Sequence, residues 1–387
     1  MNGEKSGSVW SSDNNMEKLA TVDSCVSAAE QINGSLSMTE TEFRPKISVL
    51  HSLRKPDGTT GYVDHMIESA PAGLEVLPMS WKTALIGKYD VFHIHWPEYL
   101  VRAKTVPARV AKKILFVALV ARLRMTRTPI VRTAHNVEPH ETGSSIEAAL
   151  LRWCDRKTDH FICLNVTTQV PEGKPHSVIL HGHYRDRPDY QSTSPSEPNR
   201  LLYFGLIRPY KGIEDLISAF GSLGADDLNL RIVGKPQSDE LANEIRSLCC
   251  DNPSISTKLA YVPDSELAEE IARSALVVLP YREMHNSGSV ILALSMNRPV
   301  LVPDTPANRA LRDEVGPGWI YLYDDPVIDA ATLRQALDMV ATDDRPSSPD
   351  LSARDWDRIG EKHYAAYAEL LGIPVTAETR GTVDCGG

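Results

Sequence analysis

Two cationic side chains follow an apolar run at residues 201–204 and could bind a diphosphate. Gly205 ends this run, Arg208 and Lys211 come next, and Gly212 opens a helical stretch. The first amide groups of a helix have no partner within the helix and attract anions. Two cations beside such a helix start suit the paired phosphates of a nucleotide. The alternative is a pair of solvated loop charges, which are common on protein surfaces.

A second polar loop, Asn286-Ser287-Gly288-Ser289, could serve the same ligand. It lies between an apolar run and another helical stretch. Gly288 permits a close approach of the backbone, and Ser287 and Ser289 are residues that typically cap helices. The loop therefore predicts a second helix start that faces the same ligand.

Histidines and glutamates gather in two segments of the first half of the chain, where they could act as general bases. One segment reads His-x-His-Trp-Pro-Glu and the other Thr-Ala-His-Asn-Val-Glu-Pro-His-Glu. The candidate bases are His95, Glu98, His135, Glu138, His140 and Glu141, with Trp96 beside them, and the first choices are Glu138, His135 and His140. Such residues can also ligate zinc, but no helix places two of them at i and i+4, so we expect no metal. A third interpretation is that these histidines are ordinary loop residues held by hydrogen bonds.

The apolar runs alternate with helical stretches, which is typical of parallel sheets covered by helices. The alternation occupies residues 45–181 and restarts at 200–351, after a segment rich in proline and serine at 182–199. A last helix is expected at 352–371. We therefore predict an α/β fold with two Rossmann-like domains that face each other across a cleft and a C-terminal helix that crosses back. Ligands of such sheets bind beyond the carboxyl ends of the strands.

Composition excludes several classes of protein. The 387 residues include 41 Lys and Arg against 51 Asp and Glu, and a net charge of −10 argues against a general nucleic-acid binder. No apolar run approaches the roughly 20 residues that span a bilayer. The six cysteines show no metal-binding spacing. Residues 1–44 are rich in polar residues and lack a secretory signal, so we expect a disordered tail on a cytoplasmic protein.

One segment is basic although the chain is acidic. Between Leu100 and Val137 there are nine Lys or Arg residues and no Asp or Glu. On a helix at 106–127, one face would carry Arg109, Lys112, Lys113, Arg124 and Arg127. The helix either meets an anionic surface, such as the inner face of the plasma membrane, or is an ordinary amphipathic helix with a solvated basic face.

Over about residues 46–371 the chain resembles the glycosyltransferases of the GT-B fold. The segment from Gly205 to Gly212 is similar to the donor site of family 4-like members, which implies that Arg208 and Lys211 hold the donor's diphosphate. The two histidine-rich strings resemble bacterial exopolysaccharide β-mannosyltransferases. This resemblance also takes in a loop that would face the cleft and leave room for donor and acceptor, Gly58-Thr59-Thr60-Gly61.

One departure from family 4-like enzymes concerns stereochemistry. Retaining members carry a Glu-x7-Glu motif; Glu283 lies near its first position, but Leu292 occupies the second. The resemblance therefore favours an inverting, metal-independent and cofactor-free transfer of mannose from GDP-mannose to a hydroxyl of a glycan or lipid-linked acceptor. The alternatives are a retaining transferase that uses a UDP-sugar, a nucleotide-sugar 2-epimerase, and a non-catalytic sugar-binding protein.

Overall fold

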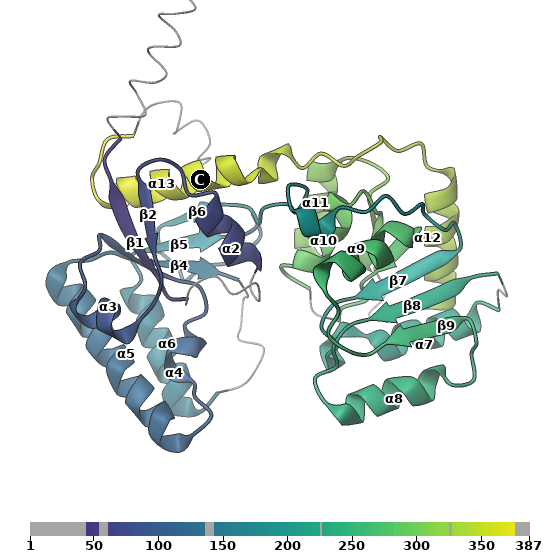
Figure 1. The fold of residues 1–387 in the computed structure, drawn as a ribbon, viewed down its shortest axis with the longest axis horizontal. Coiled ribbons are helices and arrows are strands. Elements are labelled where there is room, and N and C mark those ends of the chain that lie inside the picture. Colours follow the sequence, from purple (N-terminus) through teal and green to yellow (C-terminus); the bar gives the residue numbers. More distant parts are fainter. Residues whose placement is uncertain are drawn as a thin grey trace, which may run out of the picture. The chain divides into compact units, whose positions relative to one another are not determined.

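The computed structural model describes six stretches of the chain, with short gaps between them. They are residues 44–53, 61–135, 143–224, 227–282, 284–324 and 327–375. All but the last residue of the tail predicted at 1–44 lies outside the described residues. Within these stretches the chain forms two sheets of six strands, and every strand pair is parallel (Figure 1).

The first sheet has the strand order β2-β1-β3-β4-β5-β6. Its strands are β1 Ile47–His51, β2 Leu74–Leu77, β3 Val91–Ile94, β4 Ile130–Ala134, β5 His160–Cys163 and β6 His176–Val178. Side chains alternate between its two faces, and a separate apolar core covers each face. Val49 and Val91 belong to one core, while Leu50 and Phe92 belong to the other. Burial on both faces explains why the strands are apolar runs rather than alternating ones.

The second sheet has the order β12-β11-β10-β7-β8-β9. Its strands are β7 Arg200–Phe204, β8 Asn229–Val233, β9 Ile255–Lys258, β10 Leu276–Val278, β11 Val300–Pro303 and β12 Ile320–Tyr323. One continuous apolar cluster packs around it. The order of strands reverses at β7, which lies between β10 and β8. Ligands of open parallel sheets bind at such a reversal, so the loop after β7 is a candidate binding position.

Helices connect the strands and cover the sheets. Those of the first sheet are α2 Gly61–Glu68, α3 Trp81–Ile86, α4 Glu98–Val101, α5 Val106–Thr126 and α6 Ser145–Lys157. Those of the second are α7 Ile213–Ser222, α8 Asp239–Cys249, α9 Asp264–Arg273, α10 Gly288–Ser295, α11 Pro306–Val315 and α12 Ala330–Thr342. Short polar side chains cap many of their starts: Ser144, for example, accepts a hydrogen bond from the Glu147 amide.

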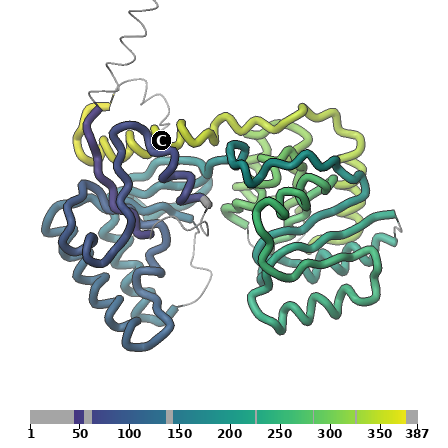
Figure 2. Tube along the Cα trace, in the orientation of Figure 1, coloured from purple at the N-terminus to yellow at the C-terminus, as the bar shows by residue number. Residues whose placement is uncertain are grey.

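The last helix returns to the first sheet. This helix, α13 (Trp356–Leu370), lies beside α2 and β1, as the yellow and purple segments of Figure 2 show. Its side chains Trp356, Ile359 and Tyr367 complete the core on that face. Gly360 lets the helix approach closely, because a Cβ there would lie only 2.3 Å from the Ser69 carbonyl oxygen. The two ends of the described chain therefore share one core.

The parallel, doubly wound architecture predicted from the sequence is confirmed, and the differences are local. The predicted helix at 352–371 begins as a 3-10 turn, Ser352–Arg354, before α13. The four-residue helix α4 was not predicted, because it is too short to show a helical period. Between β6 and β7 the only regular element in the described chain is the 3-10 turn Pro188–Tyr190. The domain boundaries at 45–181, 182–199 and 200–351 stay predictions.

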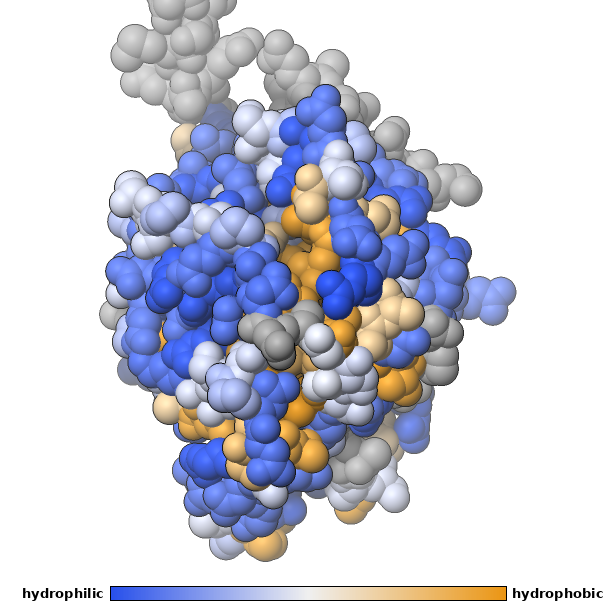
Figure 3. Space-filling view, turned by 90° about the vertical axis from the view of Figure 1, so that its right-hand side faces the viewer, coloured by the Kyte–Doolittle hydropathy of each residue, from blue (hydrophilic) through white to orange (hydrophobic). Residues whose placement is uncertain are grey.

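The surface and the helix lengths agree with the composition. On the face shown in Figure 3, hydrophilic residues predominate, and hydrophobic ones form a narrow band between them. Within the described stretches, no helix combines the length and the apolarity needed to cross a bilayer.

Replacing Gly360 with alanine should lower the free energy of unfolding by about 1–3 kcal/mol, because the added methyl group pushes α13 away from the Ser69 carbonyl. Chemical denaturation measures this change. The matched control is Gly221→Ala near the end of α7, where a Cβ would meet nothing within 4 Å. That variant should be neutral or gain up to about 1 kcal/mol. Equal stabilities of the two variants would contradict the close packing of α13.

Candidate functional site

The loop after β7 holds a buried lysine beside a glycine. Lys211 ends the 3-10 turn Pro209–Lys211, and Gly212 follows in the left-handed region at φ +63°. A side chain at Gly212 would also collide with the Pro280 carbonyl oxygen, 2.3 Å from its Cβ. Only glycine therefore fits this position, and its backbone turns Lys211 inward while α7 starts.

Lys211 points to a small space next to Gly205. Its Nζ donates a hydrogen bond to the Tyr281 hydroxyl at 3.0 Å and lies 4.2 Å from the centre of that ring. A Cβ built on Gly205 would lie 3.8 Å from this Nζ and 3.2 Å from the Ser289 hydroxyl. The predicted cation and one predicted loop serine thus meet where Gly205 has no side chain.

Arg208 is the second predicted cation. It is half-buried at the start of the same turn, and its guanidinium makes no hydrogen bond or ion pair with any other described residue. Most other arginines nearby are paired; Arg282, for example, binds the Asp215 carboxylate at 2.6 Å. Among the described residues, nothing therefore occupies the donors of Arg208, which could bind an external anion.

The residues of the loop predicted at 286–289 make different contacts. Ser287 caps α10, accepting from the Val290 amide at 3.4 Å, while Ser289 faces Gly205. Asn286 points to the first sheet instead: its Nδ2 donates to the His135 carbonyl at 2.8 Å, and its Oδ1 accepts from Asn165 Nδ2 at 2.7 Å. The structure thus brings Lys211, Gly205 and Ser289 together and places Asn286 on the other side of the loop.

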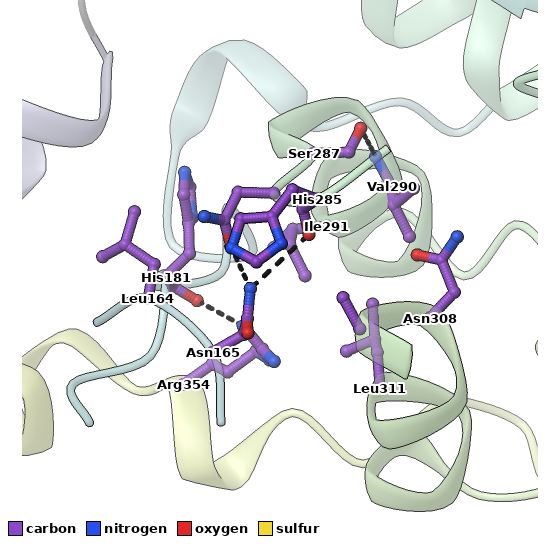
Figure 4. Close-up of a pocket in the computed structure, with 12 residues that line it drawn as sticks. Leu164, Asn165, His181, His285, Ser287, Val290, Ile291, Asn308, Leu311 and Arg354 are labelled. Atoms are coloured by element: carbon purple, nitrogen blue, oxygen red, sulfur yellow. Dashed lines mark hydrogen bonds between the residues drawn. The ribbon is translucent and has the colours of Figure 1, made fainter. Parts of the chain in front are cut away.

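A small pocket lies behind this loop (Figure 4). Asn165, His181, His285 and Arg354 contribute polar atoms to it, and α10 and α11 supply apolar side chains. Its volume is about 40 Å³. That is room for a few water molecules, whereas pockets for small-molecule ligands are typically about 300–1,000 Å³. The pocket is therefore not the nucleotide site.

Histidines converge at the carboxyl ends of the first sheet's central strands. His51 ends β1, His93 lies in β3, His95 follows β3 and His135 follows β4. Because these strands are adjacent and parallel, their ends meet at one edge. His95 Nδ1 is 3.3 Å from His135 Nε2, and His95 Nε2 is 3.0 Å from His51 Nδ1. The Trp96 ring stacks on His135 at 4.1 Å between ring centres.

Burial keeps these imidazoles neutral. It lowers the pKa of His51 and of His135 to about 3, and the pKa of His181 to about 4. Burial also lowers the pKa values of His93 and His95 well below the ordinary value, and neighbouring histidines add to the effect. A general base works best when its pKa is near the working pH. His135 is therefore unprotonated at neutral pH but only a weak proton acceptor.

Three of these histidines lie close enough together to be considered as ligands of a metal ion. His51, His93 and His95 are buried, and their ligand atoms lie within 4.8 Å of one another. However, His93 already bonds the Tyr367 hydroxyl and the Thr133 hydroxyl, both at 2.7 Å. His95 Nε2 and His51 Nδ1 are likewise bonded to each other at 3.0 Å. Because these nitrogens already have hydrogen-bond partners, the three residues do not fit a metal ion.

The remaining predicted residues are placed as follows. Glu98 is half-buried in the first turn of α4. Burial lowers the pKa of Arg132, and the negative charge of Glu98 partly opposes this lowering. Leu292 is buried in α10, so no carboxylate occupies that position. Gly61 begins α2. The predicted residues outside the described stretches are Gly58, Thr59, Thr60, Glu138, His140, Glu141 and Glu283.

Several residues of the site were not predicted. Tyr281 lies three residues after the end of β10, and Asn165 lies two residues after the end of β5. The only sign of either in the sequence was a polar group just past an apolar run. His51, at the end of β1, gave the same sign. Their partners lie 40 or more residues away along the chain, so spacing could not reveal them.

Comparison with known proteins gives a consistent result. Residues 198–340 match the family described as Glycosyl transferases group 1. The chain is 44% identical over 342 residues to the GDP-mannose:glycolipid 4-beta-D-mannosyltransferase of Xanthomonas campestris pv. campestris. That alignment covers 88% of this chain and 97% of the relative.

Solved structures agree at the level of the fold. Sucrose-phosphate synthase from Thermosynechococcus elongatus has a TM-score of 0.60 at 15% identity, over 84% of this chain and 99% of that one. Anabaena Alr3699/HepE in complex with UDP-glucose has a TM-score of 0.55 at 14% identity, again over 84% and 99%. At these identities the likeness shows the architecture alone.

The buried histidines should make stability depend on pH. The pKa of His51 is about 3 and that of His363 about 4 in the folded chain, against about 6.5 when unfolded. Between these values the unfolded chain binds more protons, so the free energy of unfolding falls as the pH drops below about 6.5. Each such group contributes up to about 1.4 kcal/mol per pH unit.

Urea unfolding between pH 7.5 and 5.5 measures this dependence. His51→Gln should flatten the profile by about one proton, whereas His176→Gln, at an exposed position, should leave it unchanged. A wild-type stability that does not fall over this range would contradict the burial of neutral imidazoles.

Proposed function

Because the chain belongs to the group 1 glycosyltransferases and has their GT-B fold, we propose that it transfers mannose from GDP-mannose to a glycolipid acceptor. The observation that carries this proposal is the 44% identity over 97% of a relative that is named for that transfer. The relative is matched across both sheets, so its likeness extends to the donor side and the acceptor side alike.

The donor's diphosphate would lie beside Gly205. Lys211 Nζ and the Ser289 hydroxyl flank this glycine, and Arg208 lies in the same loop without a protein partner among the described residues. As the bond to the sugar breaks, negative charge develops on the leaving phosphate. Fixed cations and donors at that point stabilise the transition state more than the ground state. Tyr281 would hold the Lys211 ammonium in place.

The transfer would invert the anomeric carbon. GDP-mannose carries its sugar in the α configuration, so a β-linked product requires attack from the opposite face. Leu292 leaves no second carboxylate in α10. A single displacement needs one general base on the acceptor hydroxyl. Since the pKa of His135 is lowered to about 3, the better candidate is the Glu138 carboxylate, with His140 next.

Arg208→Ala should reduce kcat by about 10²–10³, because it removes one charged donor from the developing phosphate charge. The assay follows mannose transfer from GDP-mannose to a glycolipid, and NMR of the new anomeric proton reads the configuration. Arg246→Ala on the exposed side of α8 is the control and should keep full activity.

Several outcomes would count against this proposal. A kcat/KM near the wild-type value in Arg208→Ala would remove the diphosphate assignment. An α-linked product would identify a retaining enzyme, and preferential turnover of a UDP-sugar would overturn the donor. Conversion of the donor without any acceptor would point to an epimerase.

The glycolipid acceptor suggests a membrane surface, and α5 offers a face that suits one. Val106, Val110, Ile114 and Val117 form an exposed apolar stripe, 43–65% exposed, at helical spacing. Arg109 lies beside them and makes no side-chain hydrogen bond or ion pair with another described residue. Within the described stretches, the Lys113 ammonium contacts Ser144 Oγ at 3.4 Å and no other polar partner. Exposed apolar residues flanked by cations are typical of helices that lie on anionic membranes.

Three of the five bases predicted for this face have structural roles. Lys112 donates to the backbone carbonyls of Tyr99 and Arg102, and Arg124 pairs with Asp159 at 2.8 Å. Arg127 caps the helix in the left-handed region. We therefore assign the membrane contact to the apolar stripe with Arg109 and Lys113.

Arg109→Glu combined with Lys113→Glu should weaken binding to anionic vesicles by at least about tenfold, since each basic residue near such a surface contributes about 1 kcal/mol. Vesicle flotation measures it. Arg246→Glu on α8 has the same kind of charge change away from α5 and should not affect flotation. Unchanged vesicle binding and unchanged turnover of long-chain glycolipid in the double variant would refute the membrane face.

A further inference from the structure

Three histidines form a hydrogen-bonded chain beneath the site. His135, after β4, bonds His95, after β3, and His95 bonds His51, at the end of β1. His51 and His95 are 2% and 1% exposed, and His135 is half-buried. A neutral imidazole carries a proton on only one of its two nitrogens. The proton position on any one ring therefore fixes the positions on the other two.

The far end of the chain sets its direction. His51 Nε2 is buried and has no hydrogen-bond partner among the described residues. Buried N–H groups without an acceptor are rarer in proteins than acceptors that lack a donor, so this nitrogen carries the lone pair. The proton of His51 is then on Nδ1 and is donated to His95 Nε2. His95 in turn donates from Nδ1 to His135 Nε2, which leaves the proton of His135 on Nδ1.

The neighbouring His363 in α13 shows the same arrangement. Its Nδ1 lies 2.9 Å from the Ile359 carbonyl, which can only accept, so its proton is on Nδ1. Its Nε2 is buried and has no partner in the part of the chain that the structure describes, and with the proton on Nδ1 it carries the lone pair. In this assignment the unpartnered nitrogens of His51 and His363 both carry a lone pair, so neither ring leaves a buried N–H group without an acceptor.

The surroundings keep the chain neutral and His135 in position. The titratable groups that face His135 among the described residues are His95, His181 after β6, Tyr62 of α2, and Arg132 on its own strand; none is an acid. Burial lowers the pKa values of all three rings of the chain. Trp96 stacks on the His135 ring at 18° between planes, and Asn286 holds its backbone carbonyl.

We propose that His95, backed by His51, is a positioning residue that holds His135 as the Nδ1–H tautomer, so that His135 donates a hydrogen bond to an oxygen of the bound substrate. The oxygen would be a sugar hydroxyl or a phosphate oxygen, and His135 would not be the base. This role in turnover rests on the proposed transferase function, whereas the tautomer itself does not.

The test uses two variants of nearly equal shape. At position 95 the amide nitrogen of asparagine can replace His95 Nδ1 as a donor to His135, whereas the carboxylate of aspartate can only accept. Both lose the contact with His51, so they differ in the direction of the hydrogen bond to His135 and in the negative charge of the aspartate. His95→Asn should keep kcat within a few-fold, and His95→Asp should lose about tenfold or more, since His135 would turn its donor away from the substrate.

The tautomer is read directly from nitrogen-15 NMR of histidine-labelled wild-type protein without substrate, with the His135 signals assigned by their loss in His135→Asn. We expect the proton on Nδ1 in the wild type and in His95→Asn, and on Nε2 in His95→Asp. The Asp variant should also gain an ionisation in its pH–rate profile, because a carboxylate beside His135 raises its pKa.

An Nε2–H His135 in the wild type would overturn the proposal, whether or not the variants fold. So would equal kcat values and identical tautomers in the two variants. The NMR result does not depend on the donor, so a chain with the Nδ1–H tautomer but no mannose transfer would refute the proposed function and leave the tautomer assignment intact.

Discussion

The parallel pairing of β1, β3 and β4 is the constraint on which the acceptor side depends. Each strand ends in or just before a histidine, and the parallel register brings the three ends to one edge of the sheet. There the imidazoles of His51, His95 and His135 find hydrogen-bond partners in each other. A buried polar group is tolerable only when it is paired. The sheet and its polar edge therefore stabilise each other, and a slip of one strand would break both.

The donor side depends on glycine instead of histidine. Gly205 leaves an empty volume between Lys211 and Ser289, and Gly212 lets the chain turn so that Lys211 is buried rather than solvated. The Tyr281 hydroxyl accepts a hydrogen bond from the buried Lys211 amine, and the Tyr281 ring contacts it. Asn286 then ties the donor loop to the backbone of His135, so the two halves of the site are bonded through one side chain.

Local patterns predicted the elements of the site better than its contacts. The fold class and the loop from Gly205 to Gly212 could be predicted because strand periodicity, glycine and charge are all visible within a few residues. The bond between His51 and His95 joins residues 44 positions apart and follows from register, which sequence spacing does not reveal. Likewise Asn286 was grouped with the phosphate ligands, although both ends of its amide bond other parts of the chain. The basic face of α5 was overestimated for the same reason: a helical wheel cannot show that Lys112 reaches two carbonyl groups.

The return of α13 to the first sheet has a consequence for biosynthesis. Tyr367 bonds His93, and Trp356 and Ile359 fill the core beside β1, so the segment translated first lacks part of its interior until the segment translated last leaves the ribosome. Domains usually mature in the order in which they are made. Here the second sheet, whose core is built from residues 201–351, can finish earlier, and the histidine-lined edge of the first sheet stays open to water until α13 has been made.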